Sequence, residues 1–78
     1  MPKYYFDIRD SAGLSRDDEG VDLPDLRSAE TEASLSLAGM AGDAVARMGR
    51  QEMGIDVRST EGPLFQATLT FEMKRQQK

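Results

Sequence analysis

Residues 65–73, Phe-Gln-Ala-Thr-Leu-Thr-Phe-Glu-Met, alternate apolar and polar side chains without interruption. This period of two residues is typical of a β-strand that has one buried and one solvated face. Residues 55–60 alternate in the same way, and Glu61-Gly62-Pro63 between the two stretches has the composition of a turn. Together they predict a β-hairpin whose apolar side chains share one face.

The N-terminal third predicts a second pair of strands. Residues 3–10 alternate and contain three of the chain's five aromatic side chains, so we expect a strand at the centre of the sheet. Ser11-Ala12-Gly13 is a predicted turn, and residues 14–20 form either an acidic loop or a ragged return strand. Residues 21–23 alternate again and stop at Pro24, which is typical of a short edge strand pairing with the first.

Between the two strand pairs lies one amphipathic helix, predicted over residues 26–48. Asp25 is a good N-cap, and Gly49 or Gly54 can end the helix. Apolar residues recur at helical spacing and define the stripe that should face the sheet. The stripe consists of Leu26, Ala29, Ala33, Leu37, Met40, Ala41, Ala44 and Met48.

The order β-β-α-β-β predicts an α+β fold, with a small antiparallel or mixed sheet and one long helix packed on one face. We expect one domain over residues 1–73 and a flexible basic tail over 74–78. The predicted core consists of Tyr4, Phe6, Ile8, Leu23, Leu26, Ala33, Leu37, Met40, Ala44, Met48, Ile55, Val57, Phe65, Ala67, Leu69 and Phe71.

The composition argues against catalysis. The chain has 78 residues and contains neither cysteine nor histidine, which excludes thiolate chemistry, Cys/His zinc sites and histidine as a proton carrier. The acidic residues fall on polar strand faces or in loops, and a thin core leaves little room for a dry pocket that would shift their pKa values. We therefore expect no enzymatic activity, no catalytic residues and no cofactor.

The charge argues against duplex nucleic acid. The net charge is −4, and residues 7–32 hold nine acidic residues against three arginines. Weak binding of single-stranded nucleic acid through Lys74, Arg75, Arg9 and Arg58 stays open as an alternative. The chain shows neither an N-terminal apolar segment nor a run near the roughly 20 apolar residues of a membrane span, so we expect a cytoplasmic protein.

The acidic stretch 17–22, Asp-Asp-Glu-Gly-Val-Asp, has two interpretations. Clustered carboxylates can bind Ca²⁺ or Mg²⁺, but the spacing of an EF-hand loop is missing. A solvated turn built on Asp and Gly explains the same residues, and it is the interpretation we favour.

The helix has a second line of residues, opposite the core stripe, that carries no charge. Two glycines inside a helix cost about 2 kcal/mol relative to alanine, which favours a role such as close approach of a second helix. The predicted interface of a homodimer, with Leu35 as its anchor, consists of Thr31, Leu35, Ala38, Gly39, Gly42 and Ala46. Alternatively the glycines break or kink the helix, or the face is idle.

The polar face of the sheet is another possible contact surface. We expect either a solvated face or a sheet-to-sheet dimer there. Its predicted members are Tyr5, Asp7, Arg9, Arg58, Gln66, Thr68 and Thr70.

Much of the chain resembles a family of small proteins from rhizobia and related α-proteobacteria that is known only as a domain of unknown function. The resemblance rests on residues 4–10 (Tyr-Tyr-Phe-Asp-Ile-Arg-Asp), 18–21 (Asp-Glu-Gly-Val), 23–26 (Leu-Pro-Asp-Leu), Ala29 and Glu32-Ala33. It implies no activity, cofactor or catalytic residue.

Many relatives in that family have histidine where this chain has Asp7. If the histidine carries chemistry in the family, this member lacks it. A looser similarity in layout links residues 4–37 to the small HicB-type antitoxins, which also place strands and a Leu-Pro segment before an Ala/Glu-rich helix. This chain lacks their extra strand and their appended DNA-binding part.

These observations favour a small, non-enzymatic protein-interaction module, most simply a homodimer whose further protein partner is unknown. The alternative is an antitoxin-like or regulatory inhibitor of a partner protein.

Overall fold

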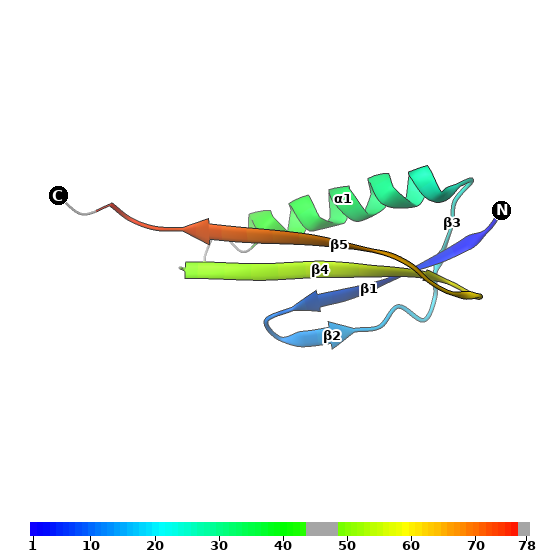
Figure 1. Ribbon diagram of the computed structural model, residues 1–78, viewed down its shortest axis with the longest axis horizontal. Coiled ribbons are helices and arrows are strands. Elements are labelled where there is room, and N and C mark those ends of the chain that lie inside the picture. Colours follow the sequence, from blue (N-terminus) through cyan, green and yellow to red (C-terminus); the bar gives the residue numbers. More distant parts are fainter. Residues whose placement is uncertain (44–48, 77–78) are drawn as a thin grey trace.

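The computed structural model describes residues 1–43 and 49–76, and it shows one antiparallel sheet with a helix on one face (Figure 1). The strands are β1 (Lys3–Asp10), β2 (Gly13–Ser15), β3 (Val21–Asp22), β4 (Gly49–Ser59) and β5 (Gly62–Met73). The helix α1 spans Leu26–Asp43. The order β-β-β-α-β-β confirms the predicted α+β class, with one strand more than expected.

β1 is central, as its aromatic content predicts. The sheet order is β2-β1-β4-β5, and β3 also pairs with β1. β2 lies against the C-terminal half of β1, where Ile8 is opposite Ser15, and β3 lies against its beginning, where Tyr4 is opposite Val21. Two short strands therefore share one side of β1, and residues 16–20 cross between them.

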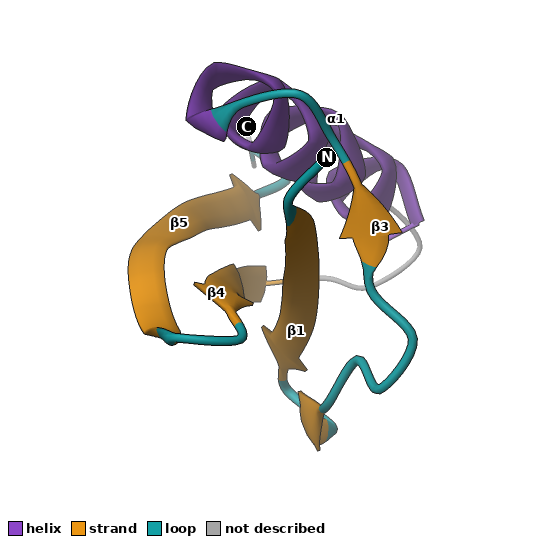
Figure 2. Cartoon of the chain, turned by 90° about the vertical axis from the view of Figure 1, so that its right-hand side faces the viewer, coloured by secondary structure: helices purple, strands orange, loops and turns teal. Residues whose placement is uncertain are grey.

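The cross-strand register places the apolar side chains in one layer beneath α1. Phe6 lies opposite Val57 and Ile8 opposite Ile55, while Phe65 lies opposite Val57 on the other side. The end-on view in Figure 2 shows α1 covering this face, with β5 curving toward it. The helix contributes three buried residues, Ala29, Ala33 and Leu37, which share a face because they are four residues apart. Small side chains at two of these positions allow α1 to lie close to the sheet.

The buried apolar core of the described residues consists of Tyr4, Ala29, Ala33, Leu37, Met53, Ile55 and Val57. The other predicted core residues Phe6, Ile8, Leu23, Met40, Phe65, Ala67, Leu69 and Phe71 are half-buried around it. The prediction that Leu26 belongs to the core is wrong, because this residue is 46% exposed at the first turn of α1. Ala44 and Met48 lie outside the described residues, and Met53 is a core residue that the prediction missed.

The predicted C-terminal end of the helix and the predicted hairpin turn also differ from the structure. Gly54 does not end a helix, because it lies inside β4 opposite Thr68. The hairpin turn is Thr60-Glu61, and Gly62 already opens β5 with a φ of +132° that favours glycine. The part of the predicted helix after Asp43, residues 44–48, falls outside the described residues.

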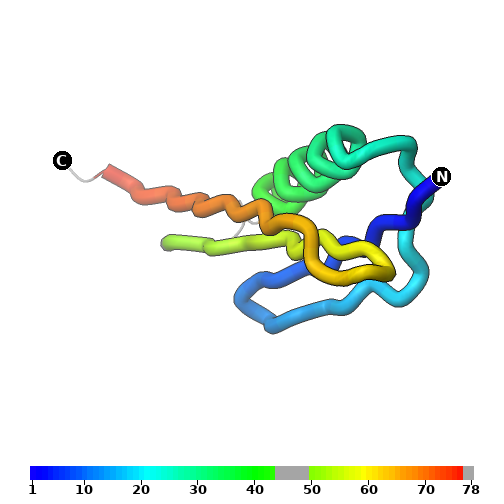
Figure 3. Tube along the Cα trace, turned by 45° about the vertical axis from the view of Figure 1, so that its right-hand side comes forward, coloured from blue at the N-terminus to red at the C-terminus, as the bar shows by residue number. Residues whose placement is uncertain are grey.

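The hairpin β4–β5 is longer than the rest of the sheet. Figure 3 shows it running on past the end of β1. The last pair that β1 forms with β4 is Arg9 with Gly54, whereas β4 and β5 stay paired as far as Gly49 with Met73. The Cα radius of gyration is 14.4 Å, against about 11.5 Å for a compact domain of this length. The projecting hairpin accounts for this elongation.

No helix in the described part of the chain is both long and apolar enough to cross a membrane.

Candidate functional site

The outer face of α1, the predicted interface, is open to solvent. Thr31, Leu35, Ala38, Gly39 and Gly42 are all exposed, and Leu35 is 65% exposed. The remaining predicted member, Ala46, lies outside the described residues. α1 runs through Gly39 and Gly42 as far as Asp43, so the helix is not broken at Gly39, and the residues after Asp43 lie outside those described.

Nothing in the described chain accounts for the two glycines. A Cβ atom placed on Gly39 or Gly42 would meet no other atom within 4 Å. Neither glycine has a positive φ, so alanine would fit the backbone at both positions. The roughly 1 kcal/mol that a glycine costs inside an exposed helix is therefore not offset by any contact among the described residues.

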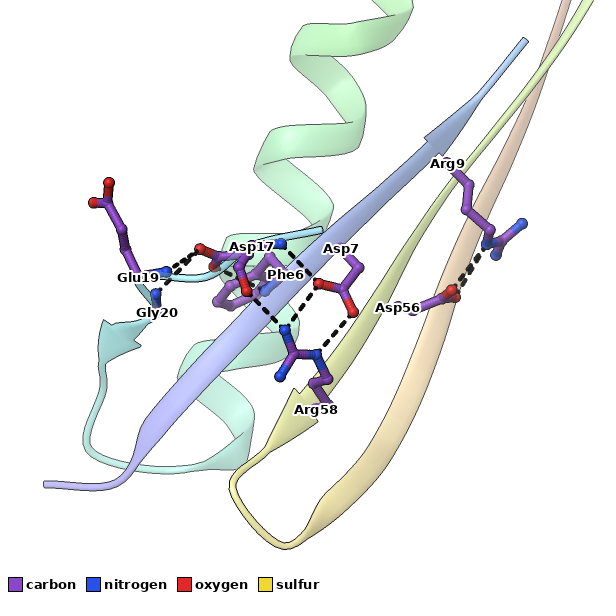
Figure 4. A network of polar contacts seen from close by, with 8 residues as sticks. All are labelled: Phe6, Asp7, Arg9, Asp17, Glu19, Gly20, Asp56 and Arg58. Carbon is purple, nitrogen blue, oxygen red and sulfur yellow. Dashed lines mark hydrogen bonds and ion pairs between the residues drawn. The ribbon is translucent and has the colours of Figure 1, made fainter. Parts of the chain in front are cut away.

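The polar face of the sheet holds a closed network of ion pairs on β1 and β4 (Figure 4), whereas its predicted members on β5, Gln66, Thr68 and Thr70, are exposed. The Nε atom of Arg58 donates to Oδ2 of Asp7 at 2.9 Å, and Nη2 of Arg58 donates to the backbone oxygen of Asp17 at 2.7 Å. The guanidinium of Arg58 also lies 4.5 Å from the centre of the Tyr5 ring. Asp7 is 6% exposed and is thus a buried acid, which alternation along β1 alone did not predict.

Burial and hydrogen bonding oppose each other at the two acids of this network. The hydrogen bond from Arg58 lowers the pKa of Asp7 below its ordinary value and outweighs the effect of burial. Burial raises the pKa of Asp17, but three backbone N–H donors, from Phe6, Gly20 and Glu19, bring it below its ordinary value. Both carboxylates are ionised at neutral pH, which makes them unsuited to donating a proton in catalysis.

The acidic stretch 17–22 is organised as a turn around Asp17. Its Oδ1 accepts hydrogen bonds from the N–H groups of Glu19 and Gly20 at 3.0 and 3.1 Å, and its Oδ2 accepts one from Phe6 at 3.1 Å. Gly20 has a φ of +76°, which the turn requires. Within the described residues, no group of three acidic side chains is placed to hold a metal ion. The geometry matches the turn interpretation.

A second ion pair lies farther along the same face. Nε of Arg9 donates to Oδ2 of Asp56 at 3.0 Å across the β1–β4 pair. Gly54 makes room for it, because a Cβ at this position would overlap the Arg9 guanidinium. Both arginines of the predicted polar face are therefore engaged by carboxylates of the same chain.

The open end of the β4–β5 hairpin, far from its turn, has a feature that the sequence analysis did not predict. Residues Gly49–Met53 of β4 pair with β5 on one side, and no described strand pairs with them on the side of β1. We call this segment the free edge of β4. A cleft of about 210 Å³ opens beside it on the helix side, bounded by Met40 and Asp43. A second hollow of about 340 Å³ lies on the polar side, bounded by Arg9 and Thr70.

Both hollows share Asp10, Glu52 and Met53, so they are the two faces of one notch where β1 stops and β4 continues. Alternation of Gln51 and Met53 with Arg50 and Glu52 was the signal in the sequence. The helical interpretation of the preceding residues concealed it.

The described residues form a small α+β domain in which Asp7 and Asp56 of the polar face are paired with arginines, and in which the outer face of α1 and the free edge of β4 are open. A family model described as a domain of unknown function (DUF6894) matches residues 3–70. The chain belongs to this family, which covers every described element except the last residues of β5. No curated protein and no solved structure matches the chain.

Proposed function

We propose that the protein is a small, non-enzymatic interaction module that acts as a homodimer. The observation that carries the proposal is the distribution of the large apolar side chains in the described chain. The core buries seven apolar residues, two of them alanines, while seven large ones stay exposed: Met1, Leu14, Val21, Leu26, Leu35, Leu64 and Met73. A chain of this size builds a thin core, and association with a second copy is a common way to cover such surface.

The outer face of α1 supports the same proposal. Leu35 is at its centre, and among the described residues no atom lies within 4 Å of a Cβ built on either of its two glycines. A second molecule that approaches this face closely would supply such a contact.

The polar face gives less support to nucleic-acid binding, the alternative from a different class. Arg9 is bound to Asp56 and Arg58 to Asp7, so phosphate contacts would compete with existing ion pairs. An inhibitor of another protein would be compatible with the exposed helix face, and it differs from a homodimer in requiring a second protein for a stable complex.

Light scattering during size-exclusion chromatography tests the proposal. At high micromolar concentration the expected mass is twice the 8.6 kDa of one chain, and dilution should bring it toward the single-chain value. A mass of 8.6 kDa at every concentration up to the high micromolar range would overturn the homodimer.

The variant Leu35→Glu then tests the outer helix face as the dimer contact. If this face is the contact, Leu35→Glu dissociates the dimer, because it places two carboxylates in an apolar interface. Ser34→Glu is the matched control, since Ser34 is exposed on α1 about a third of a turn away.

A further inference from the structure

The notch beside the free edge of β4 lies where a further strand would continue the sheet beyond the end of β1. β1 stops pairing at Gly54, but the five preceding residues of β4 continue beside β5. Their N–H and C=O groups on this side are a template for another strand, and natural proteins rarely leave such an edge open without a reason. Hollows on both faces of the sheet at the same place mark the space that a strand would fill.

The charges on the free edge are arranged to match a copy of themselves. Arg50 and Glu52 point to the same face of the sheet on either side of Gln51, and they lie 3.6 Å apart in a solvent-exposed pair. When the edge pairs antiparallel with the same edge of a second copy, centred on Gln51, each Arg50 comes to lie opposite Glu52 of the second copy. This arrangement produces two opposite-charge cross-strand pairs related by the two-fold axis.

The alternation of the strand restricts the possible registers. Residues that lie directly opposite each other in an antiparallel pair point to the same face of the sheet. The two-fold axis must therefore pass through a residue, because an axis between two residues would set side chains of opposite faces against each other. A pairing centred on Arg50 would place two arginines opposite each other, and one centred on Glu52 would place two glutamates there. Only the register centred on Gln51 pairs unlike charges throughout.

The pairing is limited by the end of β1. Arg9 lies opposite Gly54, so the next residue of β1, Asp10, adjoins Met53 and takes the place of a partner residue there. The residues that pair across the axis are therefore Arg50, Gln51 and Glu52, a length within the usual range of strands in globular proteins.

We propose that the free edge of β4 pairs antiparallel, through Arg50, Gln51 and Glu52, with the same edge of a second copy and joins two sheets into one. The proposal rests on the homodimer proposed above and assigns its contact to the free edge of β4 in place of the outer face of α1. The two-fold axis is perpendicular to the joined sheet, so both α1 helices lie on the same side of it. Their outer faces, including Leu35, then stay free for a further partner.

Charge exchange tests the register. Arg50→Glu or Glu52→Arg alone places like charges opposite each other twice, and we expect dimerisation about tenfold weaker by sedimentation equilibrium at 50 mM salt. The double variant Arg50→Glu/Glu52→Arg restores the opposite pairs and should dimerise like the parent chain. An equimolar mixture of the two single variants should also dimerise, because one edge is then acidic and the other basic.

Matched controls carry the same charge changes elsewhere. Glu61→Arg lies in the β4–β5 turn and Arg75→Glu lies after β5, and both residues are exposed. Neither variant should change the dimer constant by more than about twofold if the edge is the contact. An unfolded variant is recognised by circular dichroism, and the restored double variant shows that the single changes act on the contact.

A cysteine crosslink tests the centre of the register independently. The chain has no cysteine, so Gln51→Cys introduces a single thiol. Opposite residues in an antiparallel pair have Cα atoms about 4.5 to 5.5 Å apart, which is within the range of a disulfide. We expect a covalent dimer of Gln51→Cys under mild oxidation and none from Thr60→Cys or Leu35→Cys.

The possible failures can be told apart. A single-chain mass at all concentrations would overturn both the homodimer and its proposed contact. A dimer that ignores charge exchange but crosslinks through Leu35→Cys and dissociates on Leu35→Glu would overturn the edge pairing and leave the homodimer standing. A dimer that ignores charge exchange and forms no crosslink through Gln51→Cys would overturn the edge pairing as well.

Discussion

Arg58 and Asp7, which are 51 positions apart in the chain, form a two-point ion pair across β1 and β4. Nε of Arg58 reaches Oδ2 of Asp7 at 2.9 Å, and Nη2 reaches Oδ1 at 3.4 Å. The same Asp7 Oδ1 accepts the backbone N–H of Asp17 at 2.9 Å. One buried carboxylate thus holds together the central strand pair and the loop that runs beside β1 between β2 and β3.

Replacement of Asp7 by Asn should destabilise the fold, because it leaves the Arg58 guanidinium without a charged partner. We expect the free energy of unfolding in urea to fall by about 1–3 kcal/mol. Asp7→Ala should cost more, because it also removes the acceptor for the N–H of Asp17. A loss below about 0.5 kcal/mol for Asp7→Asn would show that the pair contributes little to stability.

Acid should destabilise the protein in a defined direction. The folded-state pKa values of Asp7 and Asp17 lie below the usual aspartate value of 3.8. Their contribution to stability is therefore fully present above the unfolded pKa and is lost as the pH falls through the lower folded pKa. Thermal unfolding should show a flat Tm from about pH 7 to 5 and a decline below about pH 4.

The variant Asp7→Asn serves as the control for this pH dependence. It should show a shallower decline of Tm in acid, because one of the two carboxylates with a lowered pKa is absent. A Tm that rises between pH 5 and pH 3 would contradict the assigned direction of both pKa shifts.

Alanine at the two exposed helix glycines should separate stability from association. A Cβ meets nothing within 4 Å at either position. Gly39→Ala should therefore stabilise the single chain by about 1 kcal/mol, and Gly42→Ala by less because Gly42 is the next-to-last residue of α1. Urea unfolding at low concentration measures this effect. If the outer helix face is a close helix–helix contact, the same variants weaken the dimer. If the free edge of β4 is the contact, the dimer constant stays unchanged.

Two crowded glycines should respond differently to alanine. A Cβ at Gly20 would lie 2.7 Å from Cγ of Lys3, and the φ of +76° is unfavourable for alanine. We expect Gly20→Ala to cost about 1–2 kcal/mol. At Gly54 only the flexible end of Arg9 obstructs the methyl group, so Gly54→Ala should cost less and should release Asp56 from its partner.

Urea unfolding of both variants compares the two positions directly. An equal loss at Gly20 and Gly54 would show that backbone strain contributes nothing at Gly20.

The sequence patterns predicted most of the architecture because strand and helix periods were strong. Alternation in residues 3–10 and 65–73 placed the core side chains on the correct face. Asp25 caps α1, because its Oδ1 accepts a hydrogen bond from the Ser28 N–H at 2.9 Å. The error lay at residues 49–54, where glycines at both ends suggested a helix terminus. Tertiary pairing with β5 decides their structure.

Counting the paired residues outward from the hairpin turn would have predicted that residues 49–54 form a strand. A turn at Thr60-Glu61 and an apolar–polar alternation reaching Met73 require a partner strand of similar length, which extends back to Gly49. The burial of Asp7 could not be predicted in the same way. It depends on residues 16–20 running beside β1, between β2 and β3, and no local pattern in these residues specifies that path.

Asp17 also occupies a position that a strand would otherwise hold. Between β2 and β3, the outward-facing N–H of Phe6 has no strand partner and bonds to the Asp17 carboxylate at 3.1 Å. A side chain thus occupies the hydrogen-bonding edge of β1 at the point where a strand of another molecule could otherwise pair. Protonation of Asp17 weakens this hydrogen bond and exposes the edge of β1, so strongly acidic solution should favour fibrous aggregates as well as unfolding.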